Sequence, residues 1–338
     1  MVRLRDIAQR LGLSVMSVSR ALRDSPDIAA ATRARVRVAA QELGYVPNIT
    51  ARGLRTRSTT LLGVVVPSLL DPVFARLVAG LEERAREVGY ELLTAQSQNL
   101  ADREDACLRS FLARRVDGVF VWPAARLAPE AQSYEEFRQR GQKLIVLGPV
   151  HPFCAEFLSV SSHDLPASHK ATEHLLTLGH RDIVHLRGPA GSPASRDRFE
   201  GYRRALRQAG LEVDDRLVFN AGNTIENGHT AALQMLNEGV RPSALFAAND
   251  AVAIGAMEAL LLQGVKVPQQ ISVVGFGNIP LAGYCRVPLT TVRQPKRVLG
   301  SAAMDLMTRL LRGEPVISAL LPAELVIRAS SGPPSTDA

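Results

Sequence analysis

The sequence predicts an α/β fold, in which a small N-terminal helix-turn-helix head precedes a larger body of two doubly wound lobes. From residue 61 onward, apolar strand-like runs alternate with helical stretches, which is typical of parallel sheets. Residues 1–60 carry 11 Arg and 4 acidic residues, whereas the rest of the chain carries 29 basic and 29 acidic ones. The net charge of +7 therefore lies in the head and predicts binding to a polyanion.

Length and cysteine content narrow the class of protein. A chain of 338 residues is too long for one compact core and suits two or three units. Cys107, Cys154 and Cys285 are odd in number and far apart, which predicts neither disulfides nor a metal site and favours a reducing compartment. The N-terminus mixes charged and apolar residues, so we expect no signal peptide, and no apolar stretch approaches the roughly 18 residues of a membrane span. We therefore expect a cytoplasmic, nucleoid-associated protein with no membrane partner, metal or cofactor.

The helix-turn-helix domain is expected over residues 1–46. Gly12 ends a first short helix, and Ser14 is a suitable N-cap for a second. A third helix should stop at Gly44, since Pro47 prevents its continuation. Apolar residues repeat at helical spacing on the expected inward faces, namely Leu4, Ile7, Ala8, Leu11, Val18, Leu22, Val36, Ala39, Ala40 and Leu43.

The second helix has the features of a recognition helix. Its N-terminal residues would meet base edges in the major groove, where Arg20 can grip guanine and Val15 and Met16 can contact a thymine methyl. Serines there suit phosphate oxygens. The alternative is a generic three-helix bundle with a solvated basic face. The expected DNA contacts in this domain are Arg3, Leu4, Ser14, Val15, Met16, Ser17, Ser19 and Arg20.

The body is expected to contain two consecutive sets of strands and helices. The run 61–67 is continuously apolar, as in a strand buried on both faces. In the first set, helices are expected at 73–88, 102–114 and 133–140, with strands at 90–94, 118–122 and 143–148. In the second, which begins near Phe157, helices are expected at 166–178, 198–210, 227–238 and 252–263. The tail 329–338 should be disordered.

Ligands of such sheets bind beyond the carboxyl ends of the strands, which singles out Asp71, Phe74, Trp122, Arg196, Arg198, Asn249 and Asn278. Phe74 and Trp122 could stack on a sugar ring, although core or rim packing is the alternative. Arg196 and Arg198, expected at the start of a helix, could clamp an anion or a hydroxyl, or lie on the surface. Asn249 could bind sugar hydroxyls or merely cap a helix.

Several motifs resemble one family. RLRDIAQRLGLSVMSVSRALRD and ELGYVPNITARGLRTRST are similar to the head of the LacI/GalR family of bacterial transcription regulators. EHLLTLGHRDI, ANDAVAIGAMEAL, VKVPQQISVVGFG and PLTTVRQP are similar to stretches of its body, so the resemblance covers essentially the whole chain. It implies a type I periplasmic-binding-protein-like body and places the two sequence-choosing positions on Val15 and Met16. It also adds Gln294 to the effector contacts.

The resemblance further implies a hinge helix over residues 47–60 that folds on operator DNA. Asn48, Ala51 and Leu54 would contact DNA, with paired Leu54 side chains entering the minor groove. A flexible tether is the alternative. The effector-binding and dimerisation domain would span 61–328. One lobe would comprise 61–160 and 291–320, and the other 161–290 and 321–328.

The function implied is that of an effector-controlled transcriptional regulator, a homodimer or tetramer that represses a carbohydrate or sugar-acid operon. An activator or global regulator with a protein corepressor, and a sugar-binding protein without a DNA function, are the alternatives. Two positions depart from the family: Gly277-Asn278 replaces a common acidic residue, and His163-Asp164 replaces an Asp-Asn pair. Losing a carboxylate while keeping Arg198 fits an acidic ligand such as a sugar acid. No enzyme motif is present, so we expect no catalytic residue.

Overall fold

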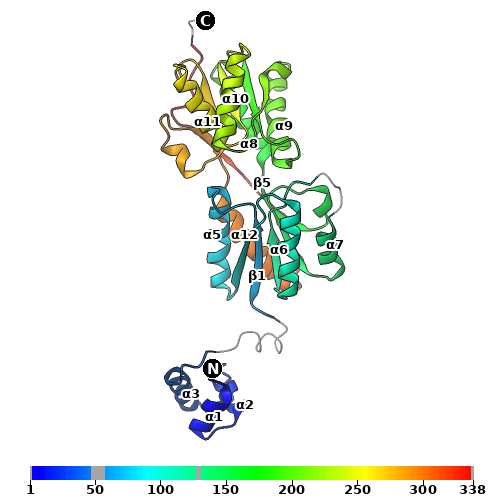
Figure 1. Cartoon of the computed structure of the whole chain (residues 1–338), viewed down its shortest axis with the longest axis vertical. Coiled ribbons are helices and arrows are strands. Elements are labelled where there is room, and N and C mark those ends of the chain that lie inside the picture. Colours follow the sequence, from blue (N-terminus) through cyan, green and yellow to red (C-terminus); the bar gives the residue numbers. More distant parts are fainter. Residues whose placement is uncertain (1, 47–57, 127–130, 336–338) are drawn as a thin grey trace. The chain divides into compact units, whose positions relative to one another are not determined.

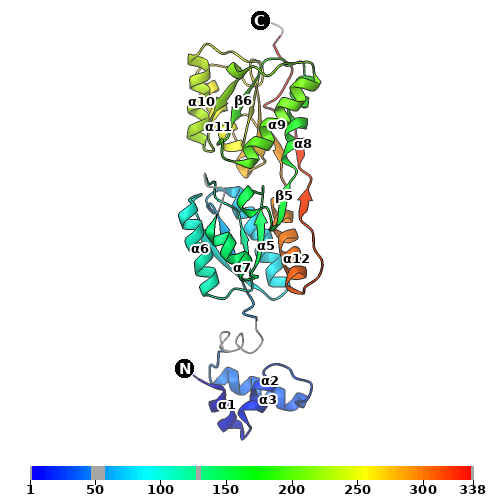
Figure 2. The same cartoon turned by 90° about the vertical axis from the view of Figure 1, so that its right-hand side faces the viewer.

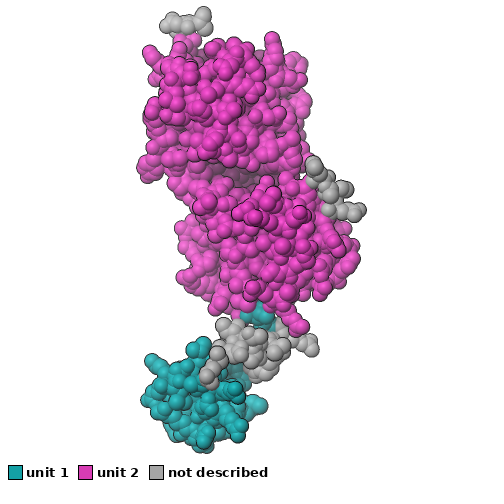
Figure 3. Space-filling view, viewed as in Figure 1, with its two compact units in different colours: residues 1–59 teal, residues 60–338 magenta. Residues whose placement is uncertain are grey.

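The computed structural model describes residues 2–46, 58–126 and 131–335. It divides into two compact units, residues 1–59 and 60–338, which we call the head and the body (Figure 3). The expected hinge contacts Asn48, Ala51 and Leu54 lie outside the described residues.

The head contains the three predicted helices, α1 (Leu4–Leu11), α2 (Val15–Ala21) and α3 (Ala30–Glu42). Gly12 ends α1 in a left-handed conformation with φ of 67°, which glycine adopts at little cost. The Ser14 side chain accepts a hydrogen bond from the Ser17 amide at 3.0 Å and so caps α2, as predicted. Ile7, Val18 and Val36 are fully buried where the three helices meet.

The first sheet of the body is entirely parallel, with strand order β11-β5-β4-β3-β1-β2. Alternate residues of β1 point to opposite faces, so Val64 and Val66 pack in one core and Val65 in another. Helices α5 and α12 cover the first face, and α6 and α7 cover the second (Figures 1 and 2). The elements are β1 (Leu61–Val66), α5 (Pro72–Glu87), β2 (Glu91–Gln96), α6 (Ala101–Ala113), β3 (Gly118–Val121), α7 (Gln132–Gln139), β4 (Lys143–Leu147), β5 (Leu158–Ser162), α12 (Lys296–Leu311) and β11 (Ala319–Leu321).

The second sheet has the order β12-β10-β9-β8-β6-β7, and only its edge strand β12 is antiparallel. Helices α8 and α9 cover one face, and α10 and α11 the other (Figure 2). The elements are α8 (Asp164–Thr177), β6 (Ile183–Arg187), α9 (Pro193–Gln208), β7 (Val218–Asn220), α10 (Ile225–Asn237), β8 (Ala244–Ala247), α11 (Asp250–Leu262), β9 (Ser272–Gly277), β10 (Thr290–Arg293) and β12 (Glu324–Val326). Short 3-10 helices in the described ranges lie at Pro152–Cys154, Asp215–Leu217 and Pro280–Gly283.

Each sheet, with its helices, forms one lobe, and the chain crosses between the lobes three times. The crossings follow β5, β10 and β11, slightly later in sequence than the expected boundaries at 160, 290 and 320. Strand β10 in particular belongs to the second sheet, whereas residues from 291 were expected in the first lobe. The reason is that Thr290–Arg293 pairs with β9 in parallel, and only then does the chain return to the first lobe as α12.

Two predictions made from sequence are wrong. The tail is not disordered from residue 329, because Ser330 is fully buried and its hydroxyl donates to the Val273 carbonyl at 2.5 Å. Helix α9 starts at Pro193 with Ser192 as its N-cap, before the expected start at 198, so Arg196 and Arg198 lie inside the helix and not at its start. A serine cap followed by proline is a start signal that occurs one turn earlier than the expected start.

Candidate functional site

The outer surface of α2 carries the predicted base-reading side chains. Val15 and Met16 are 44% and 61% exposed, although both are apolar. The N-cap Ser14 also contacts the Ser17 hydroxyl, at 2.9 Å between the two oxygens. Both residues lie in the first turn of α2, the part of a recognition helix that contacts base edges in the major groove.

Arg20, at the other end of α2, is already engaged. Its guanidinium forms an ion pair with Asp27 at 2.8 Å, and both side chains are about half exposed, at 50% and 47%. A half-exposed pair contributes little to stability, so Arg20 can leave Asp27 for a base at small cost. Of the other expected contacts, Arg3 is exposed, Ser19 is half-buried, and Leu4 packs partly against the head core.

In the body, a buried carboxylate joins residues from both lobes. Asp164 begins α8 directly after the first crossing and is only 4% exposed. Its Oδ2 accepts from Arg198 Nε at 3.0 Å and Nη2 at 2.7 Å. Its Oδ1 accepts from the Ser162 hydroxyl at 2.5 Å and from Gln294 Nε2 at 2.6 Å. The predicted residues Arg198 and Gln294 are thus brought together around an aspartate that sequence reasoning did not include.

Arg198 is held on three sides. Besides Asp164, it donates from Nη1 to the Ala248 carbonyl at 2.6 Å, and its guanidinium lies 4.1 Å from the centroid of the Phe276 ring. The side chain is 14% exposed. These contacts fix the guanidinium beside the carboxyl end of β8, where a ligand of this sheet is expected.

A second cluster gathers at the carboxyl ends of the first sheet. Phe74 and Trp122 pack edge to face, with ring centroids 4.9 Å apart. Lys296, the first residue of α12, places Nζ 5.3 Å from the Trp122 ring centroid and is 5% exposed. Burial lowers the pKa of Lys296 to about 8, partly offset by Asp164. Asp71 lies nearby but is used locally, since its carboxylate caps α5 through the Val73 amide at 2.9 Å.

The remaining expected contacts are separated from these clusters or used in the fold. Asn249 caps α11 through the Val252 amide at 2.8 Å, the alternative offered by sequence. Asn278 has φ of 51° and accepts from Arg328 at its side chain and from Arg76 at its carbonyl, which links the two lobes. The Arg196 side chain is 70% exposed and lies 4.0 Å from the Asp197 carboxylate.

Sequence reasoning missed Asp164 and Lys296 as site residues. Both follow the carboxyl end of a strand at a crossing, which was the available signal. Behind this region, Asp250 is also buried, and burial raises its pKa to about 6 despite hydrogen bonds from Thr291 and the Ile279 amide. It therefore supplies a carboxyl close to the position of the acidic residue that Gly277 replaces.

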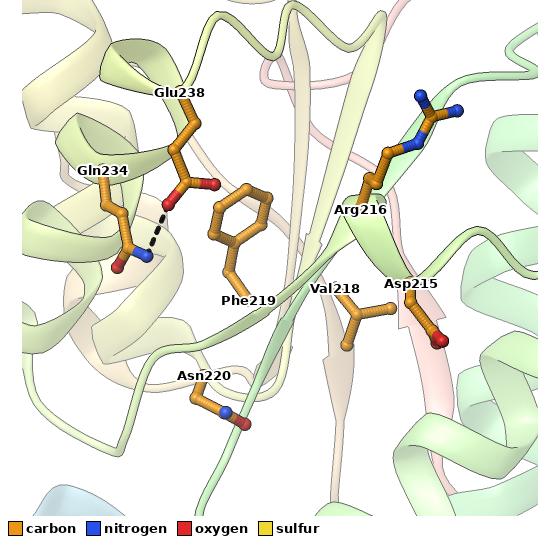
Figure 4. Close-up of a pocket in the computed structure, with 7 residues that line it drawn as sticks. All are labelled: Asp215, Arg216, Val218, Phe219, Asn220, Gln234 and Glu238. Atoms are coloured by element: carbon orange, nitrogen blue, oxygen red, sulfur yellow. Dashed lines mark hydrogen bonds between the residues drawn. The ribbon is translucent and has the colours of Figure 1, made fainter.

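Two surface hollows, at the edge strand β7 and beside α9, lie away from these clusters. One of about 360 Å³ lies at the edge strand β7, where Gln234 donates to Glu238 beside Phe219 (Figure 4). It is open and contains none of the expected effector contacts. The space-filling view shows a recess across the middle of the body, between its two lobes (Figure 3).

Comparisons with known proteins decide the family. Residues 3–48 match the model described as "Bacterial regulatory proteins, lacI family", and residues 172–331 match "Periplasmic binding protein-like domain". The chain is 33% identical to the HTH-type transcriptional repressor CytR of Escherichia coli K12 over 330 residues, 97% of this chain and 96% of CytR. The chain belongs to the LacI family.

Other relatives and solved structures agree with this membership. The ribose operon repressor of Escherichia coli K12 is 32% identical over 309 residues, 91% of this chain and 92% of that protein. The lac repressor dimer bound to operator and the anti-inducer ONPF superposes with a TM-score of 0.88 at 29% identity, covering 98% of this chain and 99% of that one. The predicted fold class is therefore confirmed, and this LacI-family protein is a DNA-binding transcriptional regulator.

The relatives found are regulators and not enzymes. In the described ranges, no cluster of three His, Cys, Asp or Glu residues is arranged to hold a metal ion. Helices long and apolar enough to cross a membrane are likewise not found among the described residues.

Proposed function

We propose that this LacI-family regulator is a homodimeric repressor of a carbohydrate or sugar-acid utilisation operon, released from its operator by a small-molecule effector. Its relatives include a ribose operon repressor, and a lac repressor solved as a dimer on operator DNA. The observation that carries the proposal for this chain is the Asp164 cluster, where hydrogen bonds join a residue of one lobe to the crossing segment that leads to the other.

Operator recognition is assigned to α2, with Val15 and Met16 choosing the sequence and Arg20 contacting a guanine. Arg3, Leu4, Ser14, Ser17 and Ser19 would position the helix on the backbone or at groove edges. Asn48, Ala51 and Leu54 of the hinge would contact the minor groove, so replacing Leu54 by Ser should reduce operator bending.

The effector would bind between the lobes. Phe74 and Trp122 offer apolar surface to a sugar ring, while Arg198, Gln294 and Asn249 offer donors and acceptors to its polar groups. Asp71, Arg196 and Asn278 remain proposed contacts at the rim. Because Asp164 and Gln294 come from different crossings, a ligand that competes for their hydrogen bonds would change the relation of the lobes.

Selection of DNA from a random pool by the full-length protein tests the proposal. The selected duplex is then titrated by anisotropy with and without sugars and sugar acids. Arg20→Ala should cost about 1–3 kcal/mol on the selected site and much less on random DNA. Arg37→Ala, which removes an ion-paired arginine from α3, is the matched control and should affect both duplexes alike. A protein that selects no sequence would refute the proposal.

A further inference from the structure

Lys296 is a buried cation without a bonding partner. Within residues 2–46, 58–126 and 131–335, its ammonium makes no hydrogen bond and no ion pair; the residue is 5% exposed, and Nζ lies over the Trp122 ring without being fully enclosed. Buried ammonium groups are normally paired, because removal from water costs several kcal/mol. The side chain therefore bears a desolvation cost that the charges of Asp164 and Asp71 offset only in part.

The neighbouring carboxylate cannot supply the missing partner. Asp164 already accepts four hydrogen bonds, two on each oxygen, from Arg198, Ser162 and Gln294. A carboxylate offers about four acceptor sites, so Asp164 is saturated. Its charge is also matched by Arg198, which itself repels Lys296.

Other acidic groups near Lys296 are similarly committed. Asp71 attracts Lys296 at longer range but accepts the Val73 amide at the start of α5. Asp164 is the carboxylate that Lys296 and Arg198 share, while Asp71 adds its charge on the side of Lys296 and Asp197 and Asp250 add theirs on the side of Arg198. The Lys296 ammonium is thus left with unused donor positions beside an indole ring, where an incoming group could accept from it.

We propose that the effector is a carbohydrate carrying an anionic group, a carboxylate or a phosphate, which accepts a hydrogen bond from Lys296 Nζ beside Trp122. This deepens the proposed function and rests on it for the location of the ligand between the lobes. The cation assigned here differs from Arg198, which the sequence suggested, because Arg198 is already neutralised by Asp164.

The only tryptophan of the chain makes the site directly observable. Trp122 emission of the full-length protein is titrated with inorganic phosphate, D-gluconate and glucose 6-phosphate, with D-glucose as the neutral counterpart, at constant ionic strength. We expect a saturable change with an anionic probe. Lys296→Met should weaken that binding about tenfold to a hundredfold, the range for a hydrogen bond to a charged group. Lys170→Met, which removes an exposed lysine of α8, should leave it unchanged.

The different probes distinguish a carboxylate ligand from a phosphate ligand, and they separate this inference from the proposed function. Gluconate alone points to a sugar acid, and glucose 6-phosphate or phosphate alone points to a phosphorylated ligand. A response to none of the charged probes, a preference for D-glucose, or an affinity that Lys296→Met retains would overturn the inference. Adding the same compounds to the protein–operator complex tests the proposed function separately: release by D-glucose only would keep effector control and refute the anion, whereas anion binding without release would do the reverse.

A second measurement needs no ligand. If Lys296 is an unpartnered buried charge, Lys296→Met should raise the melting temperature of the unliganded protein, because the variant removes a desolvation cost and keeps a side chain of similar length. Lys296→Arg, which keeps the charge, should give no such increase. A lower melting temperature for Lys296→Met would show that the lysine is a structural partner of Asp164 and would overturn the inference.

Discussion

Replacing Asp164 by Asn tests whether the buried carboxylate holds the site together. The amide keeps one acceptor oxygen but turns an NH2 group toward donors that now bond to Oδ1 or Oδ2. Arg198, 14% exposed, would lose the carboxylate that neutralises it. Breaking a buried ion pair by removing one partner typically costs about 3–5 kcal/mol.

The loss should fall near the lower end of that range. Arg198 keeps its hydrogen bond to the Ala248 carbonyl at 2.6 Å and its contact with the Phe276 ring at 4.1 Å. We therefore expect the free energy of unfolding to fall by about 3 kcal/mol. With a urea dependence of about 3 kcal/mol per M, the midpoint would fall by roughly 1 M.

Urea titrations of the full-length protein, followed by far-UV circular dichroism and by Trp122 emission, measure this change. Asp305→Asn is the matched control, because Asp305 pairs with Arg84 at 2.7 Å but is 52% exposed. Solvent screens that pair, so its removal should shift the midpoint little. If Asp164→Asn lost no more stability than Asp305→Asn, the carboxylate would not be the organising group and the reasoning would fail.

Three further outcomes follow from other contacts. Because the pKa of Asp250 is raised, the folded protein binds the Asp250 proton more tightly than the unfolded chain does. The free energy of unfolding should therefore fall as the pH rises from about 4 to 6. In urea titrations at a series of pH values, Asp250→Asn should reduce this fall. Gly80→Ala should destabilise by about 1–3 kcal/mol in the same assay, because the added Cβ would clash with the Arg297 carbonyl oxygen where α5 meets α12, whereas Gly191→Ala adds a methyl to open space. Affinity for an anionic probe should decline above about pH 8, as Lys296 loses its proton amid Asp164, Arg198 and Asp71; a constant affinity through pH 9 would contradict this assignment.

The elements of the body could largely be predicted from sequence because parallel strands are buried on both faces and are therefore apolar throughout. The run at 61–67 became β1, whose central residues are fully buried. The helices of the head could also be predicted, because Ser14 and Gly12 mark helix ends through local hydrogen bonding and backbone conformation, which need no tertiary contact.

The site was less predictable, because the partner of a polar side chain depends on the tertiary fold. Arg198 looks like a free clamp in sequence, but its carboxylate partner lies 34 positions earlier, on another helix. Asp164 was noted only as a departure from a family pair, and Lys296 was not singled out. The sequence around Asp164 or Lys296 does not show whether the fold places an opposite charge beside it.

The Asp164–Gln294 hydrogen bond has a mechanical consequence. It ties together two of the three chain crossings, at 2.6 Å, at the place where any rotation of one lobe against the other must pivot. During such a rotation, the two crossing segments must either move together or lose this hydrogen bond. A Gln294→Leu change would remove this link between the two crossings, so a single side chain outside the core of either sheet contributes to the stiffness of the body.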